Sequence, residues 1–200
     1  MVKARHPSPE AISAAAAALG CEVAAIRAVA EVEAGPHGAF LDAPGEPPVI
    51  LFERHLFDRL TEGRYRGAMV AELPPACALI SSPEPGGYGP VSQQHRRLAA
   101  AALLDEAAAL SSASWGLFQI LGLHHRRCGF SDLRAWVAAM ERSVDDHLRA
   151  FIAFVYSDAR LNLALRRLDW TAFARIYNGP GYAANRYDLR LAEAYRRAAA

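Results

Sequence analysis

Apolar residues recur every three to four positions along most of the chain, which is the spacing of amphipathic helices. The first such segment starts at Ser8 and Pro9, a helix-start signal, and Gly20 can close it in the left-handed conformation. The next segment runs from about 22 to 34, where a Gly-Pro pair stops it. We therefore expect two helices at the beginning of the chain.

A change of pattern follows. The apolar stretch "VILF" (49–52) is short and rich in β-branched residues, and it predicts one strand of a small hairpin. The loop "SSPEPGGYGPVS" (81–92) is a hinge, a lid or a plain connection. Further helices are expected at about 54–62, 92–110, 112–121, 131–156 with a break, 159–168, 169–177 and 182–198. The pattern predicts a mainly α (α+β) fold in a single domain, 1–200, with one small β-hairpin.

The amino-acid composition argues against several classes of protein. With 52% apolar residues and a net charge of +1, nothing in the 200 residues marks a nucleic-acid binder. Cys21, Cys77 and Cys128 are widely spaced, which argues against a disulfide framework or a zinc site, so no metal or cofactor is expected. No apolar run is long enough to insert stably in a membrane. The weakly hydrophobic alanines after Ser8 favour a first helix over a signal peptide, and hence synthesis in the cytoplasm.

Two glutamates end the second predicted helix. Glu31 lies one turn from Arg27, as in an exposed ion pair. Glu33 instead shares a face with apolar residues three, four and seven positions earlier: Ala30, Val29 and Ile26. Partial burial and the negative end of the helix dipole should both raise its pKa, as a general acid requires. The alternative is that Glu33 pairs with an arginine such as Arg54.

A second carboxylate would complete an acid-catalysed site. Asp42 lies nine residues after Glu33 in a turn-rich segment, from which it could return across a cleft wall. In a wetter setting it would stay ionised, to hold a water or to stabilise positive charge on a sugar ring. The alternative is an ordinary turn-forming aspartate.

Six motifs in a fixed order extend this picture. They are "EVEAG", "VILFERHLFDRLT", "GGYG", "SWGLFQI", "FARIYNGPGY" and "NRYDLRLAEAY". Together they resemble the N-acetylmuramidase family of phage endolysins and bacterial peptidoglycan hydrolases, within the lysozyme-like superfamily, over about residues 10–198. The resemblance implies a lysozyme-like helical domain that cleaves the β-1,4 bond between N-acetylmuramic acid and N-acetylglucosamine without a cofactor.

The resemblance also assigns catalytic positions. The family's catalytic glutamate falls on Glu33, its second acid on Asp42, and a threonine that assists the water on Thr61. This chain departs from the family in the turn after the glutamate, which is longer by about three residues. Glu53 is therefore a rival second acid, at about the distance where related folds place one. The alternative for Glu53 is an ion pair with Arg54 or Arg59.

Six motif residues are expected to contact the glycan: Ser114, Trp115, Gln119, Tyr177, Asn178 and Tyr88. On a helix over 112–121, a serine and a glutamine would bond sugar hydroxyls or N-acetyl groups. Trp115 would stack on a sugar ring or fill the core. Asn178 would bind substrate or only cap a helix, and Tyr88 would close over the glycan or lie in a plain connector.

The leading hypothesis is a monomeric, metal-independent muramidase whose partner is the peptidoglycan glycan strand. It would be made in the cytoplasm without a signal peptide and act on the cell wall, in the periplasm, after release. Two alternatives are a lytic transglycosylase that yields 1,6-anhydro products and a catalytically silent peptidoglycan-binding protein. The separation of the two carboxyls would decide between inversion and retention.

Overall fold

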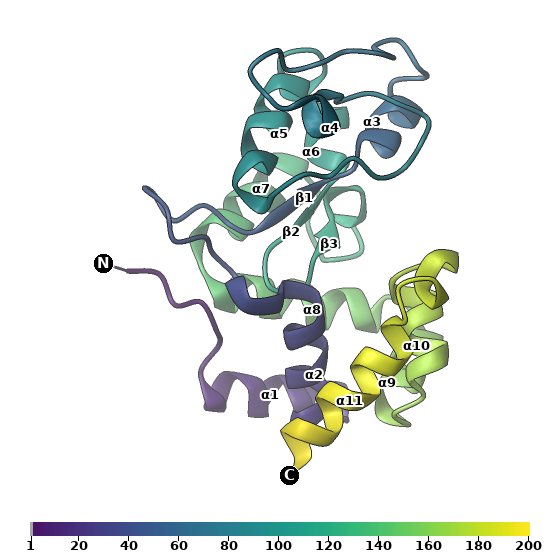
Figure 1. The fold of residues 1–200 in the computed structure, drawn as a ribbon. Coiled ribbons are helices and arrows are strands. Elements are labelled where there is room, and N and C mark those ends of the chain that lie inside the picture. The colour runs from purple at the N-terminus through teal and green to yellow at the C-terminus, as the bar shows by residue number, and fades with distance from the viewer. Residues whose placement is uncertain (1) are drawn as a thin grey trace.

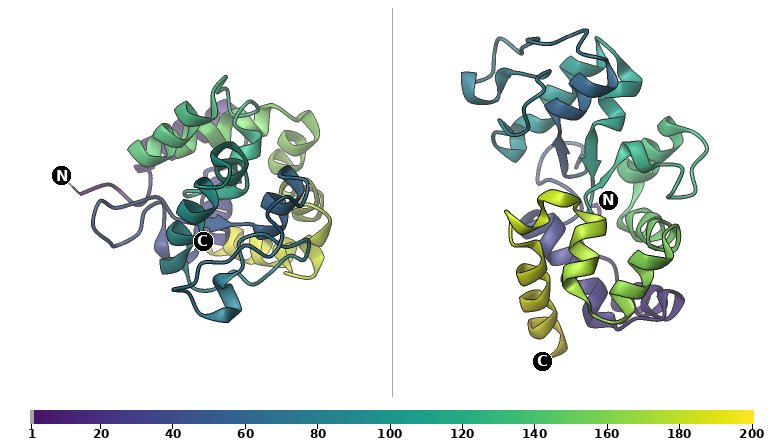
Figure 2. Two further views of the ribbon diagram at one scale, coloured as in Figure 1. Left: turned by 90° about the horizontal axis from the view of Figure 1, so that it is seen from above. Right: turned by 90° about the vertical axis from the view of Figure 1, so that its right-hand side faces the viewer.

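The computed structural model describes residues 2–200 as two lobes (Figure 1). A small lobe carries the sheet and the helices α3 to α6, and a larger helical lobe carries α1, α2 and α8 to α11. Figure 2 shows the two lobes from two further directions. The α-helices are α1 (Pro9–Leu19), α2 (Val23–Ala34), α3 (Arg54–Leu60), α4 (Pro75–Ala78), α5 (Gln94–Ala102), α6 (Glu106–Ser111), α7 (Leu133–Arg142), α8 (Val144–Tyr156), α9 (Ala159–Arg166), α10 (Trp170–Tyr177) and α11 (Tyr187–Ala199).

The first two helices follow the predicted start and stop signals. The Ser8 hydroxyl accepts a hydrogen bond from the Ala11 amide at 3.1 Å and caps α1. Gly20 ends α1 with a φ of 66°, in the left-handed region. Gly35, with a φ of 57°, ends α2 immediately after the turn that carries Glu33. The predictions for both helices are confirmed.

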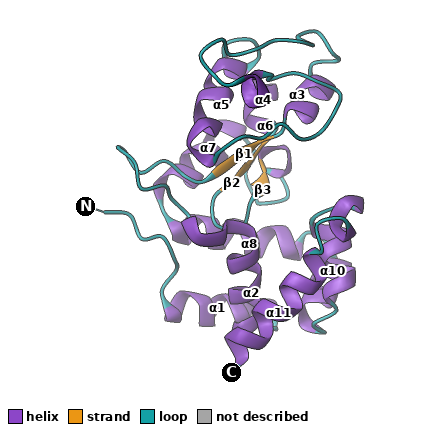
Figure 3. Cartoon of the chain, in the orientation of Figure 1, coloured by secondary structure: helices purple, strands orange, loops and turns teal. Residues whose placement is uncertain are grey.

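A three-stranded antiparallel sheet forms the side of the small lobe that faces the helical lobe (Figure 3). Its strands in the described chain are β1 (Ile50–Phe52), β2 (Ala113–Trp115) and β3 (Ile120–Leu121), in the order β1-β2-β3. The predicted strand is thus confirmed as β1, and β2 and β3 form the hairpin to which it pairs. The sheet places the end of β1 beside the hairpin, although about 60 residues separate them in sequence.

The helix predicted over 112–121 is wrong, because these residues form the β2–β3 hairpin. Gly116 and Gln119 adopt φ values of 68° and 45°, which turn the chain back on itself. Ser114 pairs with Leu51 on one side and Leu121 on the other. The apolar spacing of this segment resembles a helix only because every residue of β2 is buried, so no polar alternation marks the strand.

Among the later helices, one expected helix is broken into two, and the others differ from the prediction mainly at their ends. The single helix expected over 92–110 is broken into α5 and α6, where the Asp105 carboxylate caps α6 through the Ala108 amide at 2.9 Å. The break expected within 131–156 is confirmed at Ser143, which caps α8. The last helix starts at Tyr187, five residues later than expected, after a 3₁₀ turn over Pro180–Ala183.

The helix α2 lies in the centre of the helical lobe and packs along α11. Seven of its side chains are buried: Ala24, Ala25, Ile26, Ala28, Val29, Val32 and Ala34. Arg190 on α11 donates to the Val32 carbonyl at 3.1 Å, one residue before Glu33.

Among residues 2–200 no single helix is long and apolar enough to cross a membrane. One pair of helices, Pro9–Leu19 and Val23–His37, is long and apolar enough when taken together, but the two are bent by 110° relative to each other.

Candidate active site

A cavity of about 660 Å³ opens between the two lobes. Segments from α2, the β1–α3 junction, the 81–92 loop, the hairpin, α8 and the 177–190 region form its walls. Its lining residues are Glu33, Leu51, Glu53, His55, Leu56, Tyr88, Ser114, Gln119, Ile120, Leu121, His124, Phe154, Tyr177, Asn178, Gly181, Asn185, Tyr187 and Arg190. Seven of the ten residues proposed from the sequence therefore meet here.

Glu33 lies in the last turn of α2 and faces this cavity. Burial raises the pKa of Glu33 to about 7, while a hydrogen bond from Asn178 and the charge of Arg190 partly oppose the rise. Arg54, the arginine considered as an ion-pair partner of Glu33, instead donates to the backbone carbonyls of Glu84 and Pro85. Glu33 is thus a carboxyl that holds its proton close to neutral pH, as its periodicity in the sequence predicts.

Asn178 binds one of the two carboxyl oxygens of Glu33. Its Nδ2 atom donates to Glu33 Oε1 at 2.9 Å. In a protonated carboxyl the carbonyl oxygen is the better acceptor, so this hydrogen bond favours the acidic proton on Oε2. The other amide atom, Asn178 Oδ1, is buried and has no hydrogen-bond partner among the described residues. The geometry therefore favours one orientation of the acid.

Glu53 lies where β1 ends and α3 begins. Its backbone amide donates to the Ser112 carbonyl at 3.0 Å, which ties it to the hairpin, and its side chain does not cap α3. Neither expected arginine forms an ion pair with it in the described structure. Burial raises the pKa of Glu53, and the Tyr88 hydroxyl, His55 and Arg97 act in the opposite direction. The cavity thus contains a second carboxyl.

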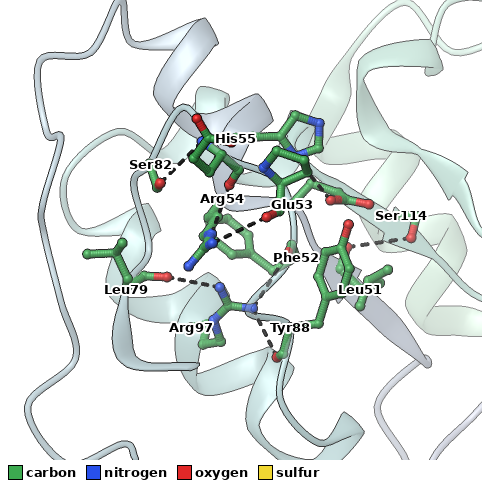
Figure 4. A network of polar contacts seen from close by, with 12 residues as sticks. Leu51, Phe52, Glu53, Arg54, His55, Leu79, Ser82, Tyr88, Arg97 and Ser114 are labelled. Atoms are coloured by element: carbon green, nitrogen blue, oxygen red, sulfur yellow. Dashed lines mark hydrogen bonds and ion pairs between the residues drawn. The ribbon is translucent and has the colours of Figure 1, made fainter. Parts of the chain in front are cut away.

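A buried arginine, Arg97, binds the backbone of the segments next to Glu53 (Figure 4). Arg97 is fully buried on α5 and donates to the carbonyls of Leu79 at 3.0 Å and Tyr88 at 3.1 Å, with a longer contact of 3.4 Å to Phe52. Burial lowers the pKa of Arg97. The guanidinium joins the end of β1 to the loop that carries Tyr88, so it holds two cavity walls together. The sequence offered no signal for this role.

Three of the residues expected to contact the glycan form hydrogen bonds within the protein through their side chains. The Ser114 hydroxyl donates to Gln119 Oε1 at 2.9 Å, and Gln119 Nε2 donates to the Gly116 carbonyl at 2.8 Å. The Tyr177 hydroxyl donates to the Phe118 carbonyl at 2.6 Å. These residues line the cavity and at the same time hold the hairpin in its turned conformation.

Three other candidates lie outside the cavity. The Asp42 side chain is 95% exposed and pairs with Arg5 at 3.2 Å. Thr61 is buried at the end of α3, where its hydroxyl donates to the Phe57 carbonyl at 2.8 Å. Trp115 is buried in the core, and its indole nitrogen donates to the Leu110 carbonyl at 3.2 Å. The structure does not bring these three to the two glutamates, because each is held on another face by its own partner.

The sequence analysis missed several lining residues. Tyr187 and Arg190 come from α11, and Tyr187 lies close enough to both glutamates that their charges help to raise its pKa. His55 lies beside Glu53 on α3. Both residues of α11 lie in the motif "NRYDLRLAEAY", whose pattern does not separate cavity residues from residues of helix packing. Residues 2–200 contain no group of three or more His, Cys, Asp or Glu side chains arranged to hold a metal.

Comparison with known proteins gives matches to a family model and to solved structures. A family model described as N-acetylmuramidase matches residues 22–199. Among solved structures, the crystal structure of a Burkholderia AP3 phage endolysin is similar, with 38% sequence identity and a TM-score of 0.79. The alignment covers all of this chain and 73% of that chain. None of the curated proteins compared matches this chain.

Proposed function

The chain belongs to the N-acetylmuramidase family, and we propose that Glu33 is the acid with which it cleaves peptidoglycan glycan strands. The protein is a peptidoglycan-cleaving glycoside hydrolase of the endolysin type, and its substrate lies in the cell wall. The observation that carries the proposal is a cavity that holds a buried carboxyl with a pKa of about 7 and a second carboxyl from the opposite lobe.

Glu33 would act on the leaving group. Its proton on Oε2 transfers to the glycosidic oxygen as the bond to the muramic acid ring breaks, and positive charge develops on that ring. Asn178 keeps Oε1 occupied and so leaves Oε2 to face the substrate. Because burial holds the proton on Glu33 up to a pH of about 7, the acid is available near neutrality.

Glu53 would act on the water, in place of Asp42. It accepts a proton from a water that attacks the anomeric carbon, and the remaining hydroxyl becomes part of the new reducing end. If Glu53 acts as this base, the single displacement inverts the anomeric configuration and NMR detects the α-anomer before mutarotation, whereas a first product with the β configuration would make Glu53 a nucleophile. The second carboxyl also supports hydrolysis over attack by the muramic acid 6-hydroxyl, since it supplies a base for water.

The decisive experiment is mass spectrometry of the fragments released from purified peptidoglycan. The wild type should release fragments with reducing N-acetylmuramic acid ends, and Glu33→Gln should release none while remaining folded. Fragments with 1,6-anhydro ends would refute the hydrolytic route. Full release by Glu33→Gln would refute the assignment of the acid.

Matched variants separate the two candidates for the second acid. Glu53→Gln should abolish release, and Asp42→Asn should keep it, because Asp42 is exposed and pairs with Arg5. The reverse result would assign the role of the second acid to Asp42. Glu31→Gln, two residues from the acid and paired on the surface with Arg197, controls for the loss of a carboxylate from α2.

We also propose that the protein acts as a monomer and is made in the cytoplasm before it reaches the wall. Size-exclusion chromatography with light scattering tests the first point, and a mass near 21.7 kDa would support it. Fractionation of producing cells tests the second point.

A further inference from the structure

His55 lies on the cavity wall beside the proposed base. It is the second residue of α3, and its Nδ1 atom lies 3.3 Å from Glu53 Oε2 (Figure 4). The side chains are 30% and 17% exposed, so the pair is largely withdrawn from solvent. Neither atom has a hydrogen-bond partner of good geometry among the described residues. Two complementary polar atoms therefore lie close together, both without a partner, at one edge of the cavity.

Buried polar atoms in proteins are nearly always satisfied, and carboxylate oxygens are costly to leave without a donor. In the described structure none of the neighbouring groups donates to this oxygen. The two terminal nitrogens of Arg97 donate to backbone carbonyls, its Nε forms no hydrogen bond with Glu53, and Arg54 donates to the 84–85 backbone. Tyr88 approaches the same carboxyl from the 81–92 loop, and one hydroxyl supplies one donor. Of the described residues, His55 is the one whose ring nitrogen lies within 3.3 Å of Oε2 and itself lacks a partner, so a small rotation of either side chain would form the hydrogen bond.

We propose that His55 is the positioning residue for the base: its Nδ1–H donates to Glu53 Oε2 and holds the carboxylate toward the attacking water. This inference rests on the proposed role of Glu53 in hydrolysis. The imidazole fixes the rotation of the carboxylate, and it stabilises the ionised form that must accept the proton. In the same way a buried histidine and carboxylate orient one another in other hydrolytic sites.

The electrostatic surroundings of Glu53 are contributed by four elements. His55 comes from α3, Arg97 from α5, Tyr88 from the 81–92 loop and Tyr187 from α11. The first three lower the pKa of Glu53 against the effect of burial. Loss of the imidazole donor should therefore raise the pKa of Glu53 and move the acidic limb of the pH–rate profile to higher pH.

The test uses two isosteric variants of the full-length protein. In His55→Asn the amide nitrogen can occupy the place of Nδ1, whereas in His55→Gln it reaches only the place of Nε2. Initial rates would be measured on a soluble labelled peptidoglycan fragment across pH 4 to 9. We expect His55→Gln to lower kcat about 10- to 100-fold with little change in KM and to shift the acidic limb upward, and His55→Asn to restore most of the activity.

The controls keep the two proposals separate. Arg59→Gln, an exposed position on the same helix, should behave as the wild type. If Glu53→Gln is inactive while His55→Gln keeps the kcat and the acidic limb of the wild type, the role of His55 is refuted and that of Glu53 stands. Equal losses in His55→Asn and His55→Gln also refute it, because packing of the ring would then be the cause. If Glu53→Gln is fully active, both proposals fail.

Discussion

The burial of Glu33 should destabilise the folded protein in a pH-dependent way. In the unfolded chain this carboxyl has a pKa near 4.5, and burial raises it to about 7 in the folded protein. The folded state therefore binds the proton more tightly. The resulting stabilisation is complete below about pH 4.5 and is lost as the pH rises through about 7. Above that pH, the enzyme must keep a desolvated anion in its core.

The size of the effect follows from the two pKa values. Each tenfold change in an ionisation constant is equivalent to about 1.4 kcal/mol, so the difference for Glu33 amounts to about 3 kcal/mol. Part of the side chain remains accessible from the cavity, which makes this figure an upper limit. A glutamine has nearly the same shape and does not ionise. Glu33→Gln should thus gain up to about 3 kcal/mol of stability relative to the wild type between pH 4.5 and pH 8.5.

Urea unfolding followed by circular dichroism measures this difference. Both proteins would be titrated at pH 4.5, 6.5 and 8.5, and the difference in unfolding free energy would be plotted against pH. Other ionisable groups cancel, since they are common to both proteins. Glu31→Gln serves as the control for removing a carboxylate from the exposed face of α2, where Glu31 pairs with Arg197. A difference for Glu33→Gln that does not change with pH would refute the raised pKa.

Three further predictions concern activity and the hairpin. The pH profile of kcat/KM should be bell-shaped, falling above about pH 7 as Glu33 loses its proton and falling at acidic pH as Glu53 gains one; a flat profile would contradict both roles. Gly116→Ala should cost about 2–5 kcal/mol in urea unfolding, since a Cβ there would lie 2.4 Å from a buried imidazole at a φ of 68°. Gly129→Ala, at a φ of 87° with open space around it, should cost only about 1–2 kcal/mol, and equal costs would refute the steric argument. Tyr177→Phe should cost about 1–3 kcal/mol, because it leaves a turn carbonyl without its donor, and an unchanged unfolding free energy would contradict that.

Local signals in the sequence were sufficient for much of the helical lobe. Caps such as Ser8 and stops such as Gly35 act within a few residues, and the apolar spacing of α2 already separates Glu33 from Glu31. The position of the proposed acid could therefore be predicted from one helix alone. The hairpin could not, because its conformation depends on pairing with β1 and on two residues with positive φ.

The second acid illustrates the same limit. Asp42 and Glu53 are both plausible in sequence, and only the packing of the small lobe shows that one faces the cavity while the other faces solvent. Burial against neighbours distant in sequence also places Thr61 away from the cavity, and for Trp115 it decides between the two alternatives in favour of core packing. Arg97, His55 and Tyr187 have no local pattern that distinguishes them from packing or surface residues. Their roles come from contacts between separate elements.

The pairing of α2 with α11 bears on when activity can arise during protein synthesis. Glu33 leaves the ribosome early, but Asn178 and Arg190, which hold its oxygen and its helix end, are 145 or more residues later. Long-range contacts of this kind form only after the distant segment has emerged and docked. A nascent chain with an exposed α2 would lack the desolvated surroundings that keep the acid protonated near neutral pH. Cleavage activity should therefore switch on late in translation, when α11 closes over the helix that carries Glu33.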